Sequence, residues 1–199
     1  MTTRVVFMLR DHEIERDDSE QVLVMAASVR TGSINQALDR YIAEELRSDG
    51  AAVGVVDLAE FAMPLYDGDL EARDGVPVAA RELAEWFGGA EVLVIVSPEY
   101  NGAFPPLLKN TIDWATRTDP SVLAHLRVLL ASVSPGRGGG AKAVAMTRTW
   151  MANIGVAVAE MSLSVGSAEL TATGAIANLD PTELSAFVVQ TRQTEPTVS

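Results

Sequence analysis

The chain has 199 residues and a formal net charge of −12, from 15 Lys and Arg against 27 Asp and Glu. So acidic a chain is not a general nucleic-acid binder, because a phosphate backbone needs a surplus of Lys and Arg to displace its counterions. It has no cysteine and only two histidines, which excludes disulfides, thiolate nucleophiles and Cys-only or His-only metal sites. With 48% apolar and 21% charged residues, the composition is that of a globular domain with a sizeable core.

The first 20 residues differ from the rest of the chain. Eight of the eleven residues at 10–20 are charged, and no period of two or 3.6 runs through the segment. We therefore interpret residues 1–20 as a charged extension and residues 21–199 as one domain. The apolar run at 5–9 is too short for a signal peptide, and no run approaches the ~20 residues that span a bilayer. These observations predict a cytoplasmic protein.

From residue 21 onward, short apolar runs alternate with longer segments of helical period. Strands are predicted at 21–27, 52–57, 91–97, 126–133 and 156–165. Helices are predicted at 33–48, 77–89, 105–117, 139–154 and 181–192. This alternation predicts an α/β fold, a doubly wound five-stranded parallel sheet with helices on both faces. Ligands of such sheets bind at the carboxyl ends of the strands, so the loops after the first, third and fourth strands form the candidate site.

The loop after the first strand reads SVRTGS at 28–33 and leads directly into a helix. Ser33 and Gln36 have the spacing of a capping box, which places Ser33 at the N-cap. Unpaired N–H groups at a helix N-terminus attract phosphate, and Arg30 adds a charged donor. The loop therefore fits either a mononucleotide phosphate or an ordinary capped turn with a surface arginine, and the loop alone does not separate the two.

The loop after the third strand begins the segment SPEYNGAFPPLLKNTIDW at 97–114. Asn101 and Gly102 favour positive φ and hence a tight turn, whose N–H groups can approach a flat ligand. A backbone platform beside a phosphate loop is the layout of a flavin site, whereas the Asn-Gly pair alone predicts only a turn. The helix that follows carries charged residues at a spacing of four, which predicts an exposed ion-pair face: Lys109, Asp113 and Arg117.

These two segments resemble the NADPH-dependent FMN reductase family, flavodoxin-like flavoproteins that include quinone, chromate and azo-compound reductases. The family's first motif, Gly-Ser-x-Arg-x-x-Ser-x-Asn, is matched at Ser28, Arg30, Ser33 and Asn35. Its second motif, Pro-Glu-Tyr-Asn-Gly followed by Leu-Lys-Asn and Asp-Trp, is matched at 98–102, 108–110 and 113–114. The stretches PLYDGDLE at 64–71 and SPGRGGGAKA at 134–143 also look similar.

The resemblance implies FMN as the cofactor, NADPH or NADH as the reductant, and a small-molecule acceptor such as a quinone, flavin, azo compound or metal oxyanion. By the resemblance, the FMN phosphate is held at Ser28, Arg30, Ser33, Ile34 and Asn35. The isoalloxazine lies along Pro98, Glu99, Tyr100, Asn101 and Gly102, and its far side is closed by Ser134 and Gly136. The resemblance also implies a homodimer or homotetramer, with no nucleic-acid or membrane partner.

Some alternatives stay open. Ala27 stands where the family usually has glycine, and it would be strained if that position needs positive φ. The glycines at 138–140 are either part of the site or a flexible lip. A flavodoxin-type electron carrier and a flavin-free binding member of the fold are the competing functions.

Overall fold

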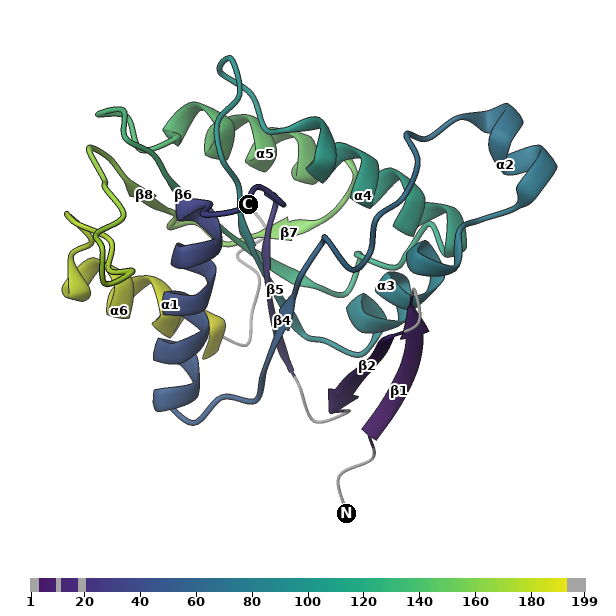
Figure 1. Ribbon diagram of the computed structural model, residues 1–199, viewed down its shortest axis with the longest axis horizontal. Coiled ribbons are helices and arrows are strands. Elements are labelled where there is room, and N and C mark those ends of the chain that lie inside the picture. Colours follow the sequence, from purple (N-terminus) through teal and green to yellow (C-terminus); the bar gives the residue numbers. More distant parts are fainter. Residues whose placement is uncertain (1–3, 10–11, 18–20, 193–199) are drawn as a thin grey trace.

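The computed structural model describes residues 4–9, 12–17 and 21–192. Its centre is a parallel sheet in the order β4-β3-β5-β6-β7, with β8 also paired to β6 (Figure 1). The strands are β3 (Val22–Ala26), β4 (Val53–Val56), β5 (Val92–Val96), β6 (Arg127–Val133), β7 (Ala157–Val158) and β8 (Leu163–Val165). Strands are added on both sides of β3, so the predicted doubly wound α/β fold is confirmed.

Helices cover both faces of this sheet (Figure 1). One face carries α1 (Ile34–Ser48) and α6 (Pro181–Val189), which continues into the 3₁₀ turn η1 (Gln190–Arg192). The other face carries α3 (Val78–Gly88), α4 (Pro106–Thr118) and α5 (Ala141–Asn153). No helix in the described part of the chain is long and apolar enough to cross a membrane.

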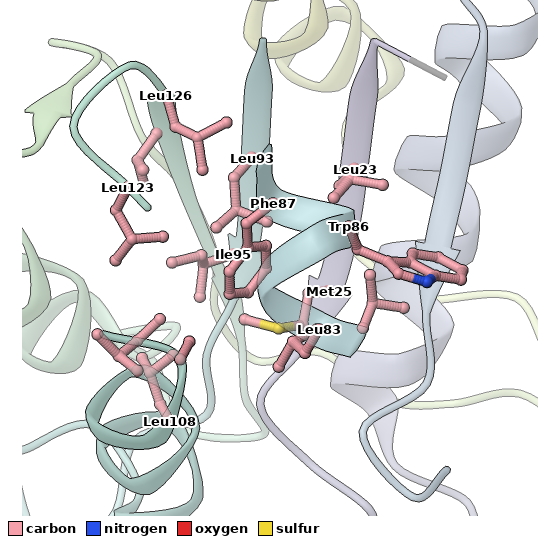
Figure 2. Packing of buried hydrophobic residues seen from close by; sticks show 14 of the residues in the cluster. Leu23, Met25, Leu83, Trp86, Phe87, Leu93, Ile95, Leu108, Leu123 and Leu126 are labelled. Carbon is pink, nitrogen blue, oxygen red and sulfur yellow. The ribbon is translucent and has the colours of Figure 1, made fainter. Parts of the chain in front are cut away.

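The two helical layers explain why the strands are apolar throughout. Side chains alternate along each strand, so Leu23 and Met25 of β3 belong to the core beneath α3 and α4, while Val24 belongs to the core beneath α1. Figure 2 shows Leu83 and Phe87 of α3 packed over the first of these cores. A strand that is buried on both faces needs an unbroken apolar run rather than an alternating pattern.

The last predicted strand, 156–165, is divided in the structure. It forms β7 and β8, which both pair with β6, so the sheet has six strands where the sequence predicted five. Between them, the guanidinium of Arg148 donates to the carbonyl oxygens of Ala159 and Glu160, at 2.5 and 3.0 Å. These carbonyls bond to a side chain instead of a neighbouring strand, which explains the break.

Helix α2 (Gly68–Asp74) was not predicted. It has seven residues and none of them is buried, so no apolar stripe marks it in the sequence. Its local signal is the N-cap, where the Asp67 carboxylate accepts the N–H of Asp69 at 2.8 Å. The capping residue was visible in the sequence, but a cap without an apolar stripe does not define a helix.

The charged N-terminal segment contains two strands that its sequence pattern does not predict. β1 (Arg4–Leu9) and β2 (His12–Asp17) pair antiparallel in a separate two-stranded sheet, which lies beside α3 in Figure 1. The sequence HEIERD of β2 has one apolar residue in six positions, so it shows none of the alternation expected of a strand.

Candidate functional site

The three loops selected from the sequence leave neighbouring strands at the carboxyl edge of the sheet. Strands β3 and β5 are adjacent, and the strand order proceeds from them in opposite directions, which makes this edge the switch point of the fold. The N–H of Ala27 donates to the carbonyl oxygen of Val96 at 2.9 Å, and that of Ser97 to the carbonyl oxygen of Ala131 at 2.8 Å. The loops after β3, β5 and β6 therefore begin side by side.

The loop at 28–33 forms the predicted capped turn. Ser33 is the N-cap of α1, and its hydroxyl accepts the N–H of Gln36 at 3.4 Å. Gly32 has φ of 68°, and a Cβ there would meet no heavy atom within 4 Å. Ala27, just before the loop, is buried and its φ is not positive, so the strain considered for this position is absent.

Arg30 and the backbone of its loop offer unused hydrogen-bond donors. The guanidinium is exposed and makes only 3.4 Å contacts to the carbonyl oxygens of Thr31 and Gly32. Within the described residues it has no carboxylate partner, and the N–H groups of residues 29–32 donate to no backbone acceptor. Free amides, the positive end of the helix dipole and a guanidinium form the donor set that a phosphate requires.

The side chain of Asn35 bonds to the backbone of β6. Its Nδ2 donates to the carbonyl oxygen of Val133 at 3.1 Å, and its Oδ1 accepts the N–H of Val133 at 3.2 Å. The residue is 4% exposed. These bonds fasten the first turn of α1 to the end of β6, so Asn35 aligns two of the loops. Ile34 packs against the core on the α1 face, so it offers a ligand only its backbone.

The turn after β5 has the predicted conformation. Asn101 and Gly102 have φ of 54° and 83°. The flanking residues Tyr100 and Ala103 exchange two backbone hydrogen bonds, of 2.8 and 3.1 Å. Positive φ at both central residues defines a type I′ turn.

Residues 98–100 connect β5 to this turn and become more exposed along the chain. Pro98 is buried and Glu99 half-buried, while Tyr100 is exposed. A Cβ on Gly102 would meet no heavy atom within 4 Å. The space that a Cβ would occupy on Gly102 is therefore open.

The loop after β6 is fastened to β8. The N–H of Ser134 donates to the carbonyl oxygen of Val165 at 3.0 Å. The carbonyl oxygen of Gly136 accepts the hydroxyl of Ser134 at 3.2 Å and the N–H groups of Gly139 and Ser167 at 3.1 and 3.0 Å. This network fixes the conformation of the segment that the resemblance places at the far side of the ring.

The glycines that follow are closely packed. A Cβ on Gly139 would lie 2.8 Å from backbone atoms of the β8 segment, and one on Gly140 would lie 1.9 Å from the hydroxyl of Ser132. Both glycines also have positive φ. The flexible-lip alternative is therefore wrong for these two positions, and only Gly138 has open space around it.

The second half of the longer motif has a structural role that sequence reasoning missed. Asn110 accepts the N–H of Tyr66 at 2.8 Å and donates to the carbonyl oxygen of Pro64 at 2.9 Å. The indole N–H of Trp114 donates to the same carbonyl oxygen at 2.8 Å. These α4 side chains thus hold the segment at 64–66 in place. The available signal in the sequence was an asparagine and a tryptophan, both with N–H donors, at a spacing of four.

The ion-pair face of α4 is present in part. Lys109 pairs with Asp113 at 2.5 Å, as predicted. Arg117 instead pairs with Glu71 of α2 at 2.9 Å, and this hydrogen bond holds the pKa of Glu71 below its usual value. The hydroxyl of Tyr66 also donates to Glu71, at 3.0 Å. Arg117 therefore links α4 to α2.

A buried carboxyl lies under the start of α1. Asp39 is 4% exposed, and its Oδ1 has no hydrogen-bond partner among the described residues. It lines a cavity of about 60 Å³ together with Gln36, Arg40 and Asp57. Burial raises the pKa of Asp39 to about 7, and the nearby charge of Arg40 only partly opposes this. An acid on the buried face of a helix was the sequence signal, and it was not used.

The opposite edge of the sheet holds a larger cavity, of about 720 Å³. Its polar lining is already engaged, since Arg192 pairs with Asp49 and the side chain of Gln21 donates to Glu91 at 3.4 Å. His125 contacts the carbonyl oxygen of Ala90 at 3.1 Å. The carboxyl edge, with its unused donors, is therefore the candidate site.

Comparison with known proteins finds relatives of this chain. The family model of NADPH-dependent FMN reductases matches residues 21–169. A quinone reductase of Escherichia coli is 36% identical over 122 residues, which cover 61% of this chain and 64% of that protein. An NAD(P)H-dependent FMN reductase of Pseudomonas aeruginosa is 34% identical over 63% of this chain and 66% of its own length. The chain thus matches just under two thirds of the length of each of these relatives.

A solved structure extends the similarity of fold to most of the chain. The flavoenzyme NAD(P)H:(acceptor) oxidoreductase of Paracoccus denitrificans superposes with a TM-score of 0.70. The match covers 85% of this chain and 93% of that one, at 24% identity. At this identity the likeness establishes a common fold.

Proposed function

Because the chain belongs to the NADPH-dependent FMN reductase family, we propose that it is an FMN-dependent NAD(P)H oxidoreductase acting on small acceptors of the quinone class. The observation that carries the proposal is the donor set at 28–33. It lies at the switch point of a doubly wound sheet and leaves its backbone amides and the Arg30 guanidinium free for a phosphate. FMN carries one such phosphate, and the turn at 100–103 lies on the neighbouring loop for its ring.

Each loop has a proposed part in binding. The hydroxyls of Ser28 and Ser33, the guanidinium of Arg30 and the amides of 29–32 hold the phosphate. The backbone of 98–102 orients the ring, and Ser134 with Gly136 borders its other side. Asn35 keeps the first and third loops in register through its two bonds to Val133.

FMN, when bound, accepts a hydride from the nicotinamide and passes two electrons to the acceptor. The protein's own contribution is to bind and orient the partners, and none of its side chains is required as a general acid or base. The N–H groups of Asn101 and Gly102, which donate to no backbone acceptor within the described residues, favour negative charge that develops beside them. A chain with two histidines and no cysteine can fill this role, because the cofactor supplies the redox chemistry and the protein binds and orients the reactants.

We also propose that the protein is cytoplasmic and works as a homodimer or homotetramer. Met146 and Trp150 of α5 and its C-cap residue Ile154 follow one another at intervals of four, and Met146 and Ile154 are 47% and 45% exposed. Trp150 stacks on Phe104 with ring centroids 4.7 Å apart. A second copy seated on this face would bury the stripe.

An absorbance spectrum tests the proposal. The purified protein, or protein incubated with FMN, is expected to absorb near ~450 nm and to bind FMN more tightly than riboflavin, which lacks the phosphate. A protein that takes up no flavin would support the flavin-free binding function instead. A protein that binds FMN and does not oxidise NADPH or NADH with a quinone would be an electron carrier.

A further inference from the structure

Asp39 is a buried carboxyl that the proposed chemistry does not use. It lies on α1, is 4% exposed, and its Oδ1 has no hydrogen-bond partner among the described residues. Ionisation would place charge on a carboxyl that is withdrawn from water and only partly hydrogen-bonded, which is costly. The folded protein therefore favours the neutral, protonated form of this side chain.

The cavity beside Asp39 lies under the loop at 28–33. It is lined by Ala26, the last residue of β3, and by Gln36, whose N–H donates to the capping hydroxyl of Ser33 at 3.4 Å. The backbone N–H of Ala26 also acts on the Asp39 carboxyl and favours its charged form. Asp39 thus lies between the point where the loop leaves the sheet and the point where it enters α1.

This position is close enough for the charge of Asp39 to act on a phosphate held by the loop. Asp39 is six residues beyond the N-cap of α1, which is ~9 Å along the helix axis, and helix side chains lean toward the N-terminus. The separation is about one Debye length at physiological salt, and buried charges are screened less than exposed ones. An ionised Asp39 would repel the phosphate and offset the positive end of the helix dipole that attracts it.

Two charged neighbours act on Asp39 with opposite signs. Burial raises the pKa of Asp39 to about 7, Arg40 lowers it and Asp57 raises it. Arg40 is on α1, Asp57 directly follows β4, and both line the same cavity. The carboxyl therefore changes its charge near neutral pH.

The other elements packed against α1 bring no further charge to this cavity. Strands β3, β4 and β5 consist of apolar residues and glycine. The charged residue of β6, Arg127, is at the start of its strand, at the opposite edge of the sheet. That of α6, Glu183, is exposed, and Arg30 belongs to the loop itself. The charge at the cavity is thus set by Asp39, Arg40 and Asp57.

We propose that Asp39 makes binding of the FMN phosphate depend on pH, because the loop at 28–33 binds it more tightly when this carboxyl is protonated than when it is ionised. The inference rests on the proposed function, which places the phosphate at that loop. A bound phosphate in turn raises the pKa of Asp39 further, so FMN binding near pH 7 is accompanied by proton uptake. Retention of the cofactor falls as the pH rises through neutrality.

FMN dissociation constants, measured by flavin fluorescence between about pH 5.5 and about pH 8.5, test the proposal. The variant is Asp39→Asn, and Glu44→Gln is the matched control because it removes an exposed carboxylate from the same helix. From the lower to the higher pH, the ratio of the wild-type constant to that of Asp39→Asn should rise by at least roughly fivefold. Glu44→Gln should follow the wild type.

The phosphate of FMN also titrates, with a second pKa of about 6. Its dianion binds cations more tightly as the pH rises, which is the opposite direction, and this contribution is common to the wild type and the variants. Riboflavin lacks the phosphate, so its ratio of constants should not change with pH. A riboflavin ratio that rose as the FMN ratio does would show that Asp39 acts through the fold, and would overturn the proposal.

The neighbours of Asp39 provide two further variants with opposite expected effects. Arg40→Gln should move the midpoint of the FMN profile to higher pH, because it removes a charge that favours the carboxylate. Asp57→Asn should move it to lower pH, and it retains a side-chain oxygen to accept the N–H of Ala59. Midpoints that stay in place in both variants would contradict Asp39 as the titrating group.

Calorimetry of the wild type in buffers of different ionisation enthalpy needs no variant. Near pH 7, FMN binding should take up protons, whereas a phosphate that binds as the dianion only releases them. Proton release, or one pH profile shared by the wild type and Asp39→Asn, would overturn the role of Asp39 and leave the proposed function intact. A wild type that binds no FMN at any pH would refute the proposed function itself.

Discussion

Arg30 stands at the start of α1 with its guanidinium exposed and held only by two 3.4 Å contacts within its own loop. A charge-assisted contact to phosphate is worth about 1.5–3 kcal/mol, whereas a serine hydroxyl contributes ~1 kcal/mol. Arg30→Ala should therefore weaken FMN binding by roughly 10- to 150-fold. Flavin fluorescence titration gives the dissociation constants. The free energy of unfolding should barely change, because an exposed side chain contributes little to the core.

Riboflavin is the matched control for this variant, because it lacks the phosphate. Wild type and Arg30→Ala should bind riboflavin about equally. An ordinary surface arginine would change FMN affinity only by what screened charge allows. Equal FMN dissociation constants for the two proteins would contradict the assignment of 28–33 as the phosphate loop.

Asp39 should make stability depend on pH. Its pKa in the folded protein is about 7, raised from 3.8 chiefly by burial, so the folded state retains a proton that the unfolded state has lost. Stability from this group is complete below about pH 4 and is lost as the pH rises toward 7, at about 1.4 kcal/mol per pH unit. Asp39→Asn keeps the shape without the charge. Chemical denaturation should find this variant more stable than the wild type at pH 8, with the advantage gone at pH 4.

Burial sets the sign of that effect, and the charged neighbours of Asp39 only modify it. Arg40 favours the charged carboxylate and Asp57 opposes it, and both line the same cavity. If Asp39→Asn lost stability equally at both pH values, the carboxylate would be ionised and bound in the folded protein. A flatter pH profile for the variant than for the wild type is the expected result.

At the scale of an element, the turn into α5 depends on glycine. Gly140→Ala places a Cβ 1.9 Å from the hydroxyl and 2.9 Å from the Cβ of Ser132, in a backbone with φ of 82°. Overlap and backbone strain together should cost about 2 kcal/mol or more in the free energy of unfolding. Gly138→Ala is the control, since it has open space and φ that is not positive. Thermal unfolding that ranked the two variants alike would show that the turn adapts.

The hairpin of β1 and β2 should be dispensable for flavin binding. Its sheet shares no strand pairing with the main sheet in the described residues, so removing it leaves the strands that carry the loops intact. A chain that begins at Glu20 should fold and bind FMN with the affinity of the full chain. A modest loss in melting temperature is expected, because β1 contacts α3. An insoluble or flavin-free product would make the hairpin a structural part of the domain.

The elements that the sequence predicted well are those buried on a defined face. The continuous apolar run of β5 and the apolar stripe of α1 follow directly from a sheet covered on both faces. Elements that are not buried on a defined face have no such pattern in the sequence and were not predicted. α2 buries no residue. The break between β7 and β8 depends on a side chain outside this segment, Arg148 of α5.

In the site too, features that depend on local sequence were predictable and features that depend on distant residues were not. The capped turn at Ser33 and the type I′ turn at Asn101 and Gly102 are set by local chemistry, so the sequence predicted both. The partner of Asn35 lies 98 residues away in the chain, and the close packing of Gly140 depends on Ser132. Such contacts follow from the tertiary arrangement and not from spacing along the chain.

For the whole molecule, the apolar stripe on α5 predicts association. One chain has a mass of 21.2 kDa, so light scattering at micromolar concentration should return two or four times that value. Ile154→Glu, which places a charge on the stripe at a 45% exposed position, should reduce the mass and leave the fold intact. A wild type at the mass of one chain would contradict the proposal of an oligomer.

The most direct test of the account is NAD(P)H oxidation by flavin-stripped and FMN-reconstituted protein with a quinone as acceptor. We expect negligible oxidation without flavin, restored turnover with FMN, and much weaker restoration by riboflavin at the same concentration, because riboflavin cannot use the donors at 28–33. Turnover that does not depend on added flavin, or that riboflavin restores as well as FMN does, would contradict it.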